Sequence, residues 1–183
     1  MKKVVLFGNG AVAHTTYHDL SLCSSEYEVA GFSVDADYLH ERTLFGLPVV
    51  PFGQVQSVFP PDQCDMLVAI GYTATNRLRA ERYLQAKEKG YRLVNFVSPN
   101  TVIYPGLEIG DNCHISHNCT IFQDVRIGNN VTVGANSVIG HDVFCRSIAA
   151  GYAACETASR IFYERCQASN GAGLSASGID GRC

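Results

Sequence analysis

Residues 103–140 read IYPGLEIGDNCHISHNCTIFQDVRIGNNVTVGANSVIG. An aliphatic side chain returns at every sixth position of this stretch: Ile103, Ile109, Ile115, Ile121, Ile127, Val133 and Ile139. A period of six fits neither an α-helix nor a simple sheet, and it is the signature of a hexapeptide β-helix. We therefore predict that each hexad supplies a short strand and a turn. The aliphatic side chains would then point to a core that the stacked coils share.

The first half of the chain alternates strand and helix patterns instead. Apolar runs within 2–10, 27–35, 64–72 and 91–97 predict strands, the first ending in Gly-x-Gly, and 11–23 and 73–90 predict helices. A shorter apolar piece with prolines, at 47–55, predicts an edge strand or a loop. Strands alternating with helices indicate a small parallel sheet covered by helices.

The repeat loses its rhythm soon after residue 140. Cys145 and Arg146 stand where the next aliphatic residue and glycine are expected, and residues 145–183 contain no valine, lysine or proline. We predict three parts: a nucleotide-binding domain at 1–97, a β-helix at 98–144, and a degenerate coil or irregular tail at 145–183. One hypothesis for the last part is a frameshifted or truncated carboxy-terminal region, which the reading frame around codon 144 would test.

Composition limits the classes of protein that this chain can be. With 46% hydrophobic and 17% charged residues and a net charge of −3, it reads as a globular protein without a basic surface for nucleic acid. It opens without a secretory signal pattern, and no apolar run approaches the roughly 20 residues of a membrane span. We therefore expect a cytoplasmic protein that does not insert into membranes. The irregular spacing of its eight cysteines favours buried free thiols.

The combination of motifs resembles a known family. KKVVLFGNG, the segment VAIGYTATNRLRAERYLQAKEKGYRLVNFVSP, the hexads and SVIGHD together resemble the NeuD/PglD-like sugar acyltransferases over residues 2–142. This resemblance implies a Rossmann-like βαβ nucleotide-binding domain followed by a left-handed parallel β-helix with three hexads per turn. It also implies a homotrimer, with acetyl-CoA as co-substrate in a groove between subunits. The general base would be His141, with Asp142 as its acidic neighbour.

The chemistry of acetyl transfer suits such a pair. The attacking amine or hydroxyl must lose a proton as the new bond forms, and the unperturbed pKa of histidine, about 6.5, lies near working pH. An adjacent carboxylate can orient the imidazole and stabilise its charged form. The alternative is that His141 is a polar corner residue on a solvated turn.

The amino-terminal domain carries candidate substrate-binding residues. Gly8, Asn9 and Gly10 would let the backbone approach a phosphate at a helix N-terminus, and Asp35 could contact a ribose or a base. Ala13 replaces the third glycine of a dinucleotide fingerprint, so an NAD site is weakly supported. The resemblance adds three further residues to the nucleotide pocket, which are Gly71, Asn76 and Arg77. A tight turn between strand and helix would explain the glycines equally well.

Two histidine patterns suggest metal sites that we do not predict. Cys113, His114, His117 and Cys119 have the content of a zinc site. In a coil of three hexads, however, positions six apart fall on successive faces, so these ligands would not converge as zinc requires. His14 and His18 lack the glutamate of the HExxH motif.

The resemblance therefore implies acetyl-CoA-dependent acetylation of an amino or hydroxyl group on a sugar, expected to be nucleotide-linked, in surface glycan synthesis. It does not choose between nitrogen and oxygen as the acceptor. Two alternatives stay open. One is a catalytically impaired nucleotide-sugar-binding or scaffold protein, and the other is a nicotinamide-dependent oxidoreductase.

Overall fold

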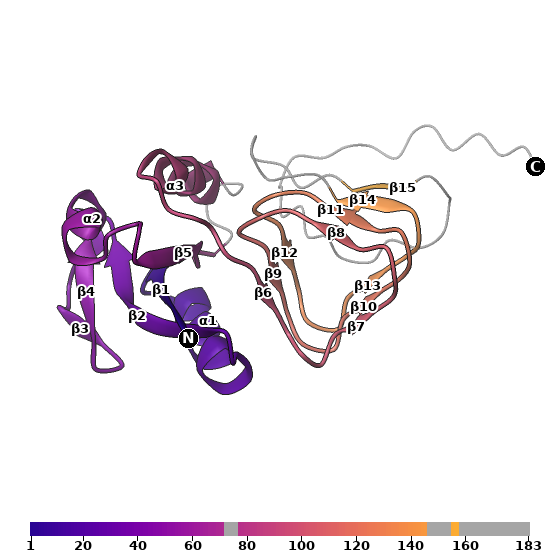
Figure 1. Cartoon of the computed structure of the whole chain (residues 1–183), viewed down its shortest axis with the longest axis horizontal. Coiled ribbons are helices and arrows are strands. Elements are labelled where there is room, and N and C mark those ends of the chain that lie inside the picture. Colours follow the sequence, from indigo (N-terminus) through magenta and orange to yellow (C-terminus); the bar gives the residue numbers. More distant parts are fainter. Residues whose placement is uncertain (72–76, 146–154, 158–183) are drawn as a thin grey trace, which may run out of the picture.

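The computed structural model describes residues 1–71, 77–145 and 155–157. Figure 1 shows an α/β part and a three-sided β-helix lying side by side. The elements of the α/β part are β1 (Lys2–Phe7), α1 (Ala11–Cys23), β2 (Tyr27–Val34), η1 (Ala36–Tyr38), β3 (Thr43–Leu44), β4 (Leu47–Pro51), η2 (Phe52–Gln54), α2 (Val55–Val58), β5 (Cys64–Val68) and α3 (Arg77–Glu88). Its sheet has the order β3-β4-β2-β1-β5, and all neighbours are parallel except β3 and β4.

Both faces of this sheet are covered, which explains its continuous apolar runs. Alternate residues of β1 enter different cores, because successive side chains of a strand point to opposite faces. Leu6 belongs to the core that contains Leu20 of α1. Phe7 belongs to the core that contains Val55 of α2 and Tyr83 of α3.

The predicted strand at 91–97 is divided between the two parts. Leu93 forms a single parallel bridge with Met66 of β5, so this end of the segment extends the sheet. β6 (Phe96–Val97) instead pairs with a strand of the β-helix. One apolar run therefore serves two sheets, a division that periodicity alone does not reveal.

The β-helix consists of short strands in three parallel sheets. They are β6, β7 (Val102–Ile103), β8 (Glu108–Ile109), β9 (His114–Ile115), β10 (Thr120–Ile121), β11 (Arg126–Ile127), β12 (Thr132–Val133), β13 (Val138–Ile139) and β14 (Val143–Cys145). Residues eighteen apart are paired, as in Val102 with Thr120 and Thr120 with Val138. Each coil therefore contains three hexads, and the repeat residues from Ile115 onward form its buried core.

The corners of the coils repeat one backbone conformation. A residue with positive φ between 54° and 59° recurs every six positions: Asn112, Asn118, Asp124, Asn130, Asn136 and Asp142. Asparagine and aspartate tolerate this left-handed conformation better than other residues with a side chain. The hexad thus encodes an inward aliphatic residue and an outward turn at the same time.

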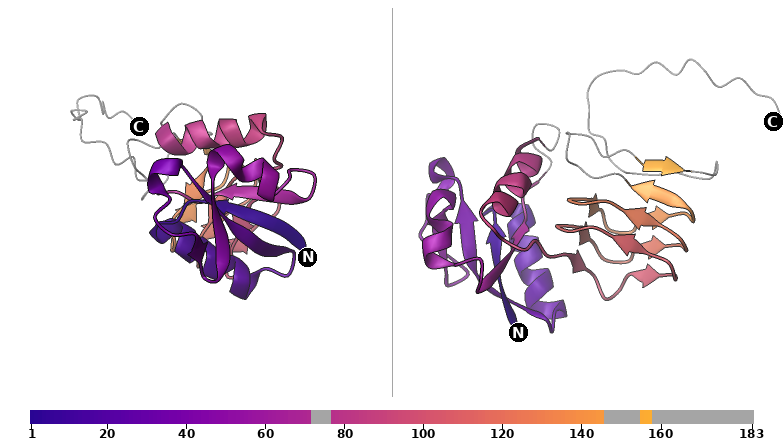
Figure 2. Two further views of the ribbon diagram at one scale, coloured as in Figure 1. Left: turned by 90° about the vertical axis from the view of Figure 1, so that its left-hand side faces the viewer. Right: turned by 45° about the horizontal axis from the view of Figure 1, so that its top comes forward.

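The repeat continues through Cys145, one residue beyond where the sequence pattern places its end. Cys145 pairs with Ile127 and is 2% exposed, so a small thiol occupies the aliphatic position. β15 (Cys155–Thr157) then pairs with β14 in the antiparallel direction. Figure 2 shows this strand at the end of the stack, where a further coil would add a parallel strand. The rest of the predicted tail lies outside the described residues.

No helix among residues 1–71 and 77–145 combines the length and the apolar character needed to cross a membrane.

Candidate functional site

A cavity of about 420 Å³ opens at the carboxyl ends of β1 and β5, beside the N-terminus of α1. It is lined by Phe7, Gly8, Asn9, Gly10, Ala11, Val12, Val34, Asp35, Tyr38, Ala69, Ile70, Gly71 and Leu78. Five of the predicted substrate-binding residues are in this set. We name it the sheet-edge cavity. Ligands of open α/β sheets bind in this position, outside the carboxyl ends of the strands.

The glycines of the first turn have different roles. Gly8 has a φ of +130°, and a Cβ there would lie 2.6 Å from the carbonyl oxygen of Ala69. Gly10 is the N-cap of α1, has an ordinary negative φ, and a Cβ there would meet no atom within 4 Å. Gly8 is therefore required by the fold, whereas Gly10 leaves open space in front of the first helical N–H groups. Such orphan N–H groups attract an anion.

We expect Gly8→Ala to lower the free energy of unfolding by roughly 1–3 kcal/mol, because alanine resists the backbone conformation and also contacts Ala69. Gly10→Ala should cost less, about 0.5 kcal/mol, because alanine is only a poorer N-cap residue than glycine and meets no atom there. Urea denaturation of both variants measures the difference. Equal losses would show that the two glycines are equivalent.

Two polar side chains at the rim of the sheet-edge cavity already have protein partners. The Asn9 side chain donates to the carbonyl oxygen of Tyr38 at 3.0 Å. Asp35 accepts hydrogen bonds from Arg82 of α3, with both carboxylate oxygens engaged at 2.9–3.1 Å. The sequence did not indicate Arg82, because it lies 47 positions from its partner.

Of the last two predicted residues, Arg77 and Asn76, only Arg77 lies in the described structure. Arg77 pairs with Glu81 on the surface of α3, and its side chain is 80% exposed. It does not line the sheet-edge cavity. Asn76 lies outside the described residues.

A second cavity, of about 230 Å³, lies between α1 and the β-helix and is here named the seam cavity. It is lined by Ala11, Val12, Thr15, Thr16, Leu67, Val68, Ala69, Arg79, His114, Ser116, Thr132 and Gly134. It shares Ala11, Val12 and Ala69 with the sheet-edge cavity. The two cavities therefore lie next to each other at the N-terminus of α1, where they share part of their walls.

Buried and partly buried polar contacts connect the α/β part with the β-helix. Asp19 of α1 accepts from His117 Nε2 at 3.0 Å, and the Nδ1 atom of this histidine lies 2.6 Å from Ser98 Oγ. Asn112, which is fully buried, accepts from the backbone N–H of Val68 at 2.8 Å. These contacts hold the walls of the seam cavity in place.

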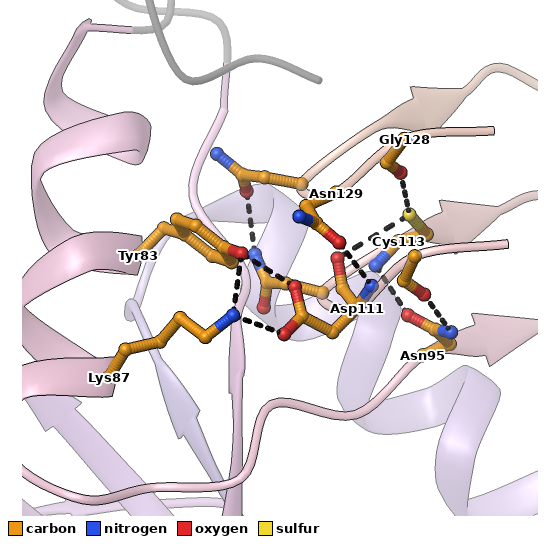
Figure 3. Close-up of polar contacts among 10 residues, drawn as sticks. Tyr83, Lys87, Asn95, Asp111, Cys113, Gly128 and Asn129 are labelled. Carbon is orange, nitrogen blue, oxygen red and sulfur yellow. Dashed lines mark hydrogen bonds and ion pairs between the residues drawn. The ribbon is translucent and has the colours of Figure 1, made fainter. Parts of the chain in front are cut away.

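Figure 3 shows a further connection, between α3 and one corner of the β-helix. The Asp111 carboxylate accepts from Tyr83 Oη and from Lys87 Nζ, both at 2.6 Å. Burial raises the pKa of Tyr83, and the hydrogen bond to Asp111 raises it further. Tyr83 therefore stays protonated and acts as a donor.

His114 on the wall of the seam cavity is a neutral histidine. Burial lowers its pKa to about 4, although the Asp19 carboxylate, 3.7 Å away, acts in the opposite direction. In the unfolded chain the pKa returns to about 6.5. The unfolded state therefore binds more protons between about pH 6.5 and pH 4, and the free energy of unfolding falls as the pH falls through this window.

We expect the titration of His114 to remove roughly 3 kcal/mol of stability over this range. Urea denaturation at about pH 7 and about pH 4.5 should show a larger loss for wild type than for His114→Gln, which cannot titrate. Parallel losses in the two proteins would mean that other groups cause the pH dependence.

His141 and Asp142 lie at a different corner of the β-helix, after β13. The Nδ1 atom of His141 lies 2.7 Å from Asp142 Oδ2. An ionised carboxylate only accepts hydrogen bonds, so the imidazole proton is on Nδ1 and the Nε2 lone pair is available. Asp142 also occupies the left-handed corner position of the repeat. Both side chains are about half exposed.

This corner faces away from the α/β part of the same chain. The α/β part contacts the sheet β12-β9-β6 and the two corners beside it, which contain Asp111 and His117. His141 belongs to the third corner, between β13 and β14, on the opposite side of the triangle (Figure 1). It lines neither cavity.

The cysteines of the suggested zinc pattern point into the β-helix. Cys113 and Cys119 are buried, and their thiols donate to the carbonyl oxygens of Gly128 and Gly134. Burial raises the pKa of Cys113 to about 11, which disfavours the thiolate that a metal would need. Within the described ranges, no three His, Cys, Asp or Glu side chains are grouped so that they could hold a metal ion.

The hexapeptide repeats match two known family models. Residues 94–123 match the model of the bacterial transferase hexapeptide (six repeats), and residues 124–143 match the hexapeptide repeat of succinyl-transferase. Together with the parallel sheets, these matches define a left-handed β-helix of bacterial transferase hexapeptide repeats.

The chain is also similar to several solved structures of larger proteins. PerB from Caulobacter crescentus, in complex with CoA and GDP-perosamine, is 28% identical with a TM-score of 0.66, and the match covers 80% of this chain and 65% of PerB. The acetyltransferase domain of PglB from Neisseria gonorrhoeae is 18% identical with a TM-score of 0.67, covering 80% and 68%. WeeI from Acinetobacter baumannii is 21% identical with a TM-score of 0.61, covering 80% and 66%. A search of curated protein sequences gave no match.

The likeness to PerB, together with the hexapeptide repeats, confirms the resemblance to the NeuD/PglD-like sugar acyltransferases, and the PglB domain and WeeI share the fold. The chain spans about two thirds of the length of these structures, 65% in the case of PerB.

Proposed function

We propose that this protein transfers an acetyl group from acetyl-CoA to an amino or hydroxyl group of a nucleotide-linked sugar. The likeness to PerB, whose structure contains CoA and GDP-perosamine, supports this reaction class. The likeness extends over both parts of the chain, since it covers 80% of its residues.

In this proposal, the α/β part is a Rossmann-like nucleotide-binding domain and the sheet-edge cavity holds the nucleotide. The diphosphate would lie at the N-terminus of α1, against the first free N–H groups after Gly10. The sugar would extend past Ala11 and Val12 into the seam cavity, because these residues line both cavities. The lining residues that the two cavities share support a substrate made of a nucleotide and a sugar.

The position of His141 is the observation that carries the proposal. It lies at the corner opposite to the α/β part of its own chain, so it cannot reach a sugar in that chain's cavities. A base there has to serve the sugar bound by another copy. Val102 and Val138, beside this corner, are exposed apolar residues, and Tyr104 stacks on Phe122 at 5.1 Å. Such a surface is typical of a contact between subunits. We therefore propose a homotrimer with acetyl-CoA bound between subunits.

The chemistry follows from the available nitrogen. His141 Nε2 would accept the proton of the sugar amine or hydroxyl. The proton would be transferred as the nitrogen or oxygen of the sugar attacks the thioester carbonyl. Asp142, bonded to Nδ1, would stabilise the imidazolium that results. Collapse of the tetrahedral intermediate would release CoA as its thiol, for which the imidazolium supplies the proton. No acyl-enzyme is needed.

Subunit complementation tests this arrangement. Gly10→Leu should fill the open space of the sheet-edge cavity without disturbing the fold, and His141→Ala removes the base. Each variant alone should be inactive, and oligomers reassembled from an equal mixture should recover about a quarter of the wild-type activity, since each site takes one residue from each of two subunits. A mixture that stays inactive, while each variant binds its remaining ligand, would contradict the shared site.

A second candidate function is nucleotide-sugar binding without transfer. The antiparallel β15 favours it, because this strand occupies the edge of β14 where a parallel coil would continue the β-helix. Calorimetry would separate the candidates. Binding of UDP- or GDP-amino sugars without binding of acetyl-CoA would support the second, and binding of NAD(H) alone would instead favour an oxidoreductase.

A further inference from the structure

The Asp35 carboxylate at the rim of the sheet-edge cavity is held in one orientation by Arg82. Arg82 Nε lies 2.9 Å from Oδ1 and 3.1 Å from Oδ2, and Nη2 lies 2.9 Å from Oδ2. The guanidinium is itself fixed, because Nη1 donates to Gln85 Oε1 at 2.9 Å. The two charged side chains are only 18% and 23% exposed, so water screens the pair weakly.

Arg82 approaches this carboxylate from outside the cavity. Asp35 lines the cavity and Arg82 does not. A carboxylate has about four acceptor positions, and a guanidinium fork occupies those on its own side. The remaining acceptor positions of Asp35 are therefore available to a ligand in the cavity.

The ion pair also changes the electrostatics of the cavity. An unpaired carboxylate would repel the phosphates of a nucleotide, whereas the charge of Arg82 compensates that of Asp35. The ion pair is neutral as a whole, and its oriented Asp35 carboxylate can accept hydrogen bonds from hydroxyl groups. In a nucleotide, the ribose carries two adjacent hydroxyls close to the phosphates.

We propose that Arg82 is a positioning residue that presents Asp35 to the ribose hydroxyls, which makes the cavity selective for ribonucleotides over nucleotides lacking these groups. This inference rests on the proposed nucleotide site, and it adds to that site a specificity and a residue on α3.

The test measures a ratio of affinities on the full-length protein by calorimetry. The probes are UDP and GDP, each compared with its 2′,3′-dideoxy form. Wild type should prefer the ribose form by roughly tenfold or more, as expected for hydrogen bonds to a charged acceptor. Arg82→Ala should bind both forms more weakly and reduce the preference to about twofold or less, because Asp35 is then unoriented and unpaired.

Two further variants make the result specific. Arg82→Lys keeps the positive charge but not the bidentate guanidinium. Compared with Arg82→Ala, it should bind both forms more tightly without the full preference for the ribose form. Arg126→Ala removes an arginine that pairs with Glu108 on the β-helix, and it should leave both affinity and preference at wild-type values.

The outcomes separate this inference from the proposed function. If wild type prefers the ribose form and Arg82→Ala keeps that preference while losing affinity equally for both forms, Arg82 is merely structural and the inference is wrong. If wild type binds UDP and GDP no better than their dideoxy forms, Asp35 does not bind the ribose hydroxyls and the inference is wrong. The proposed nucleotide site would still be supported. If wild type binds none of the probes, the proposed nucleotide site fails and the inference fails with it.

Discussion

His141→Ala should lower kcat/KM for acetyl transfer by roughly 10²–10⁴-fold, the contribution of a well-placed general base. The reason is the availability of Nε2, since Nδ1 is bonded to Asp142 at 2.7 Å. Nucleotide affinity should not change, because His141 lines neither cavity. Steady-state kinetics with acetyl-CoA and a nucleotide-linked amino sugar, together with calorimetric titration of the nucleotide, measure the two effects.

Asp142→Asn is the matched control for this prediction. Asparagine accepts the left-handed corner conformation, as it does at four other corners of the described β-helix, so the fold should be preserved. The amide cannot stabilise an imidazolium as a carboxylate does, so kcat/KM should fall, but by less than in His141→Ala because the pair is about half exposed to water. Wild-type kcat/KM in the His141→Ala protein would leave the histidine as a corner residue without a catalytic role.

The β-helix could be predicted well from the sequence because its signals are local. Each hexad repeats an inward aliphatic residue and a turn residue, so six positions determine one side of a coil. The sequence pattern placed the end of the repeat before Cys145, where a thiol replaces the aliphatic side chain. A thiol and an aliphatic side chain can both be buried at this position. Cys145 is therefore still part of the coil, paired with Ile127.

The candidate site was predictable only where it depended on local sequence. Gly8, Asn9 and Gly10 follow one strand directly, and Asp35 and Gly71 lie at or near the ends of others, so the topology of a parallel sheet brings them together. The contacts that orient them are long-range and could not be predicted. Asp35 meets Arg82 across 47 positions, and Asp19 meets His117 across 98.

Asn112→Ala should be among the most destabilising single substitutions in the β-helix, lowering the free energy of unfolding by roughly 3–5 kcal/mol. Its side chain accepts from the backbone N–H of Val68 at 2.8 Å and donates to Asn130 at 2.6 Å, with no exposure to water. The substitution leaves the Val68 N–H buried without this acceptor, in addition to the cost of alanine at a φ of 54°.

Asn136→Ala separates these two costs, because Asn136 has the same left-handed conformation but an exposed side chain. We expect it to lose only about 1 kcal/mol, the cost of the backbone conformation. Urea denaturation of both variants gives the difference, which is the contribution of the two buried hydrogen bonds of the Asn112 side chain, with Val68 of β5 and with Asn130. Equal losses would show that this buried asparagine does not hold the two parts together. In that case the seam cavity, and with it the position proposed for the sugar, would lose one of the contacts that hold its walls together.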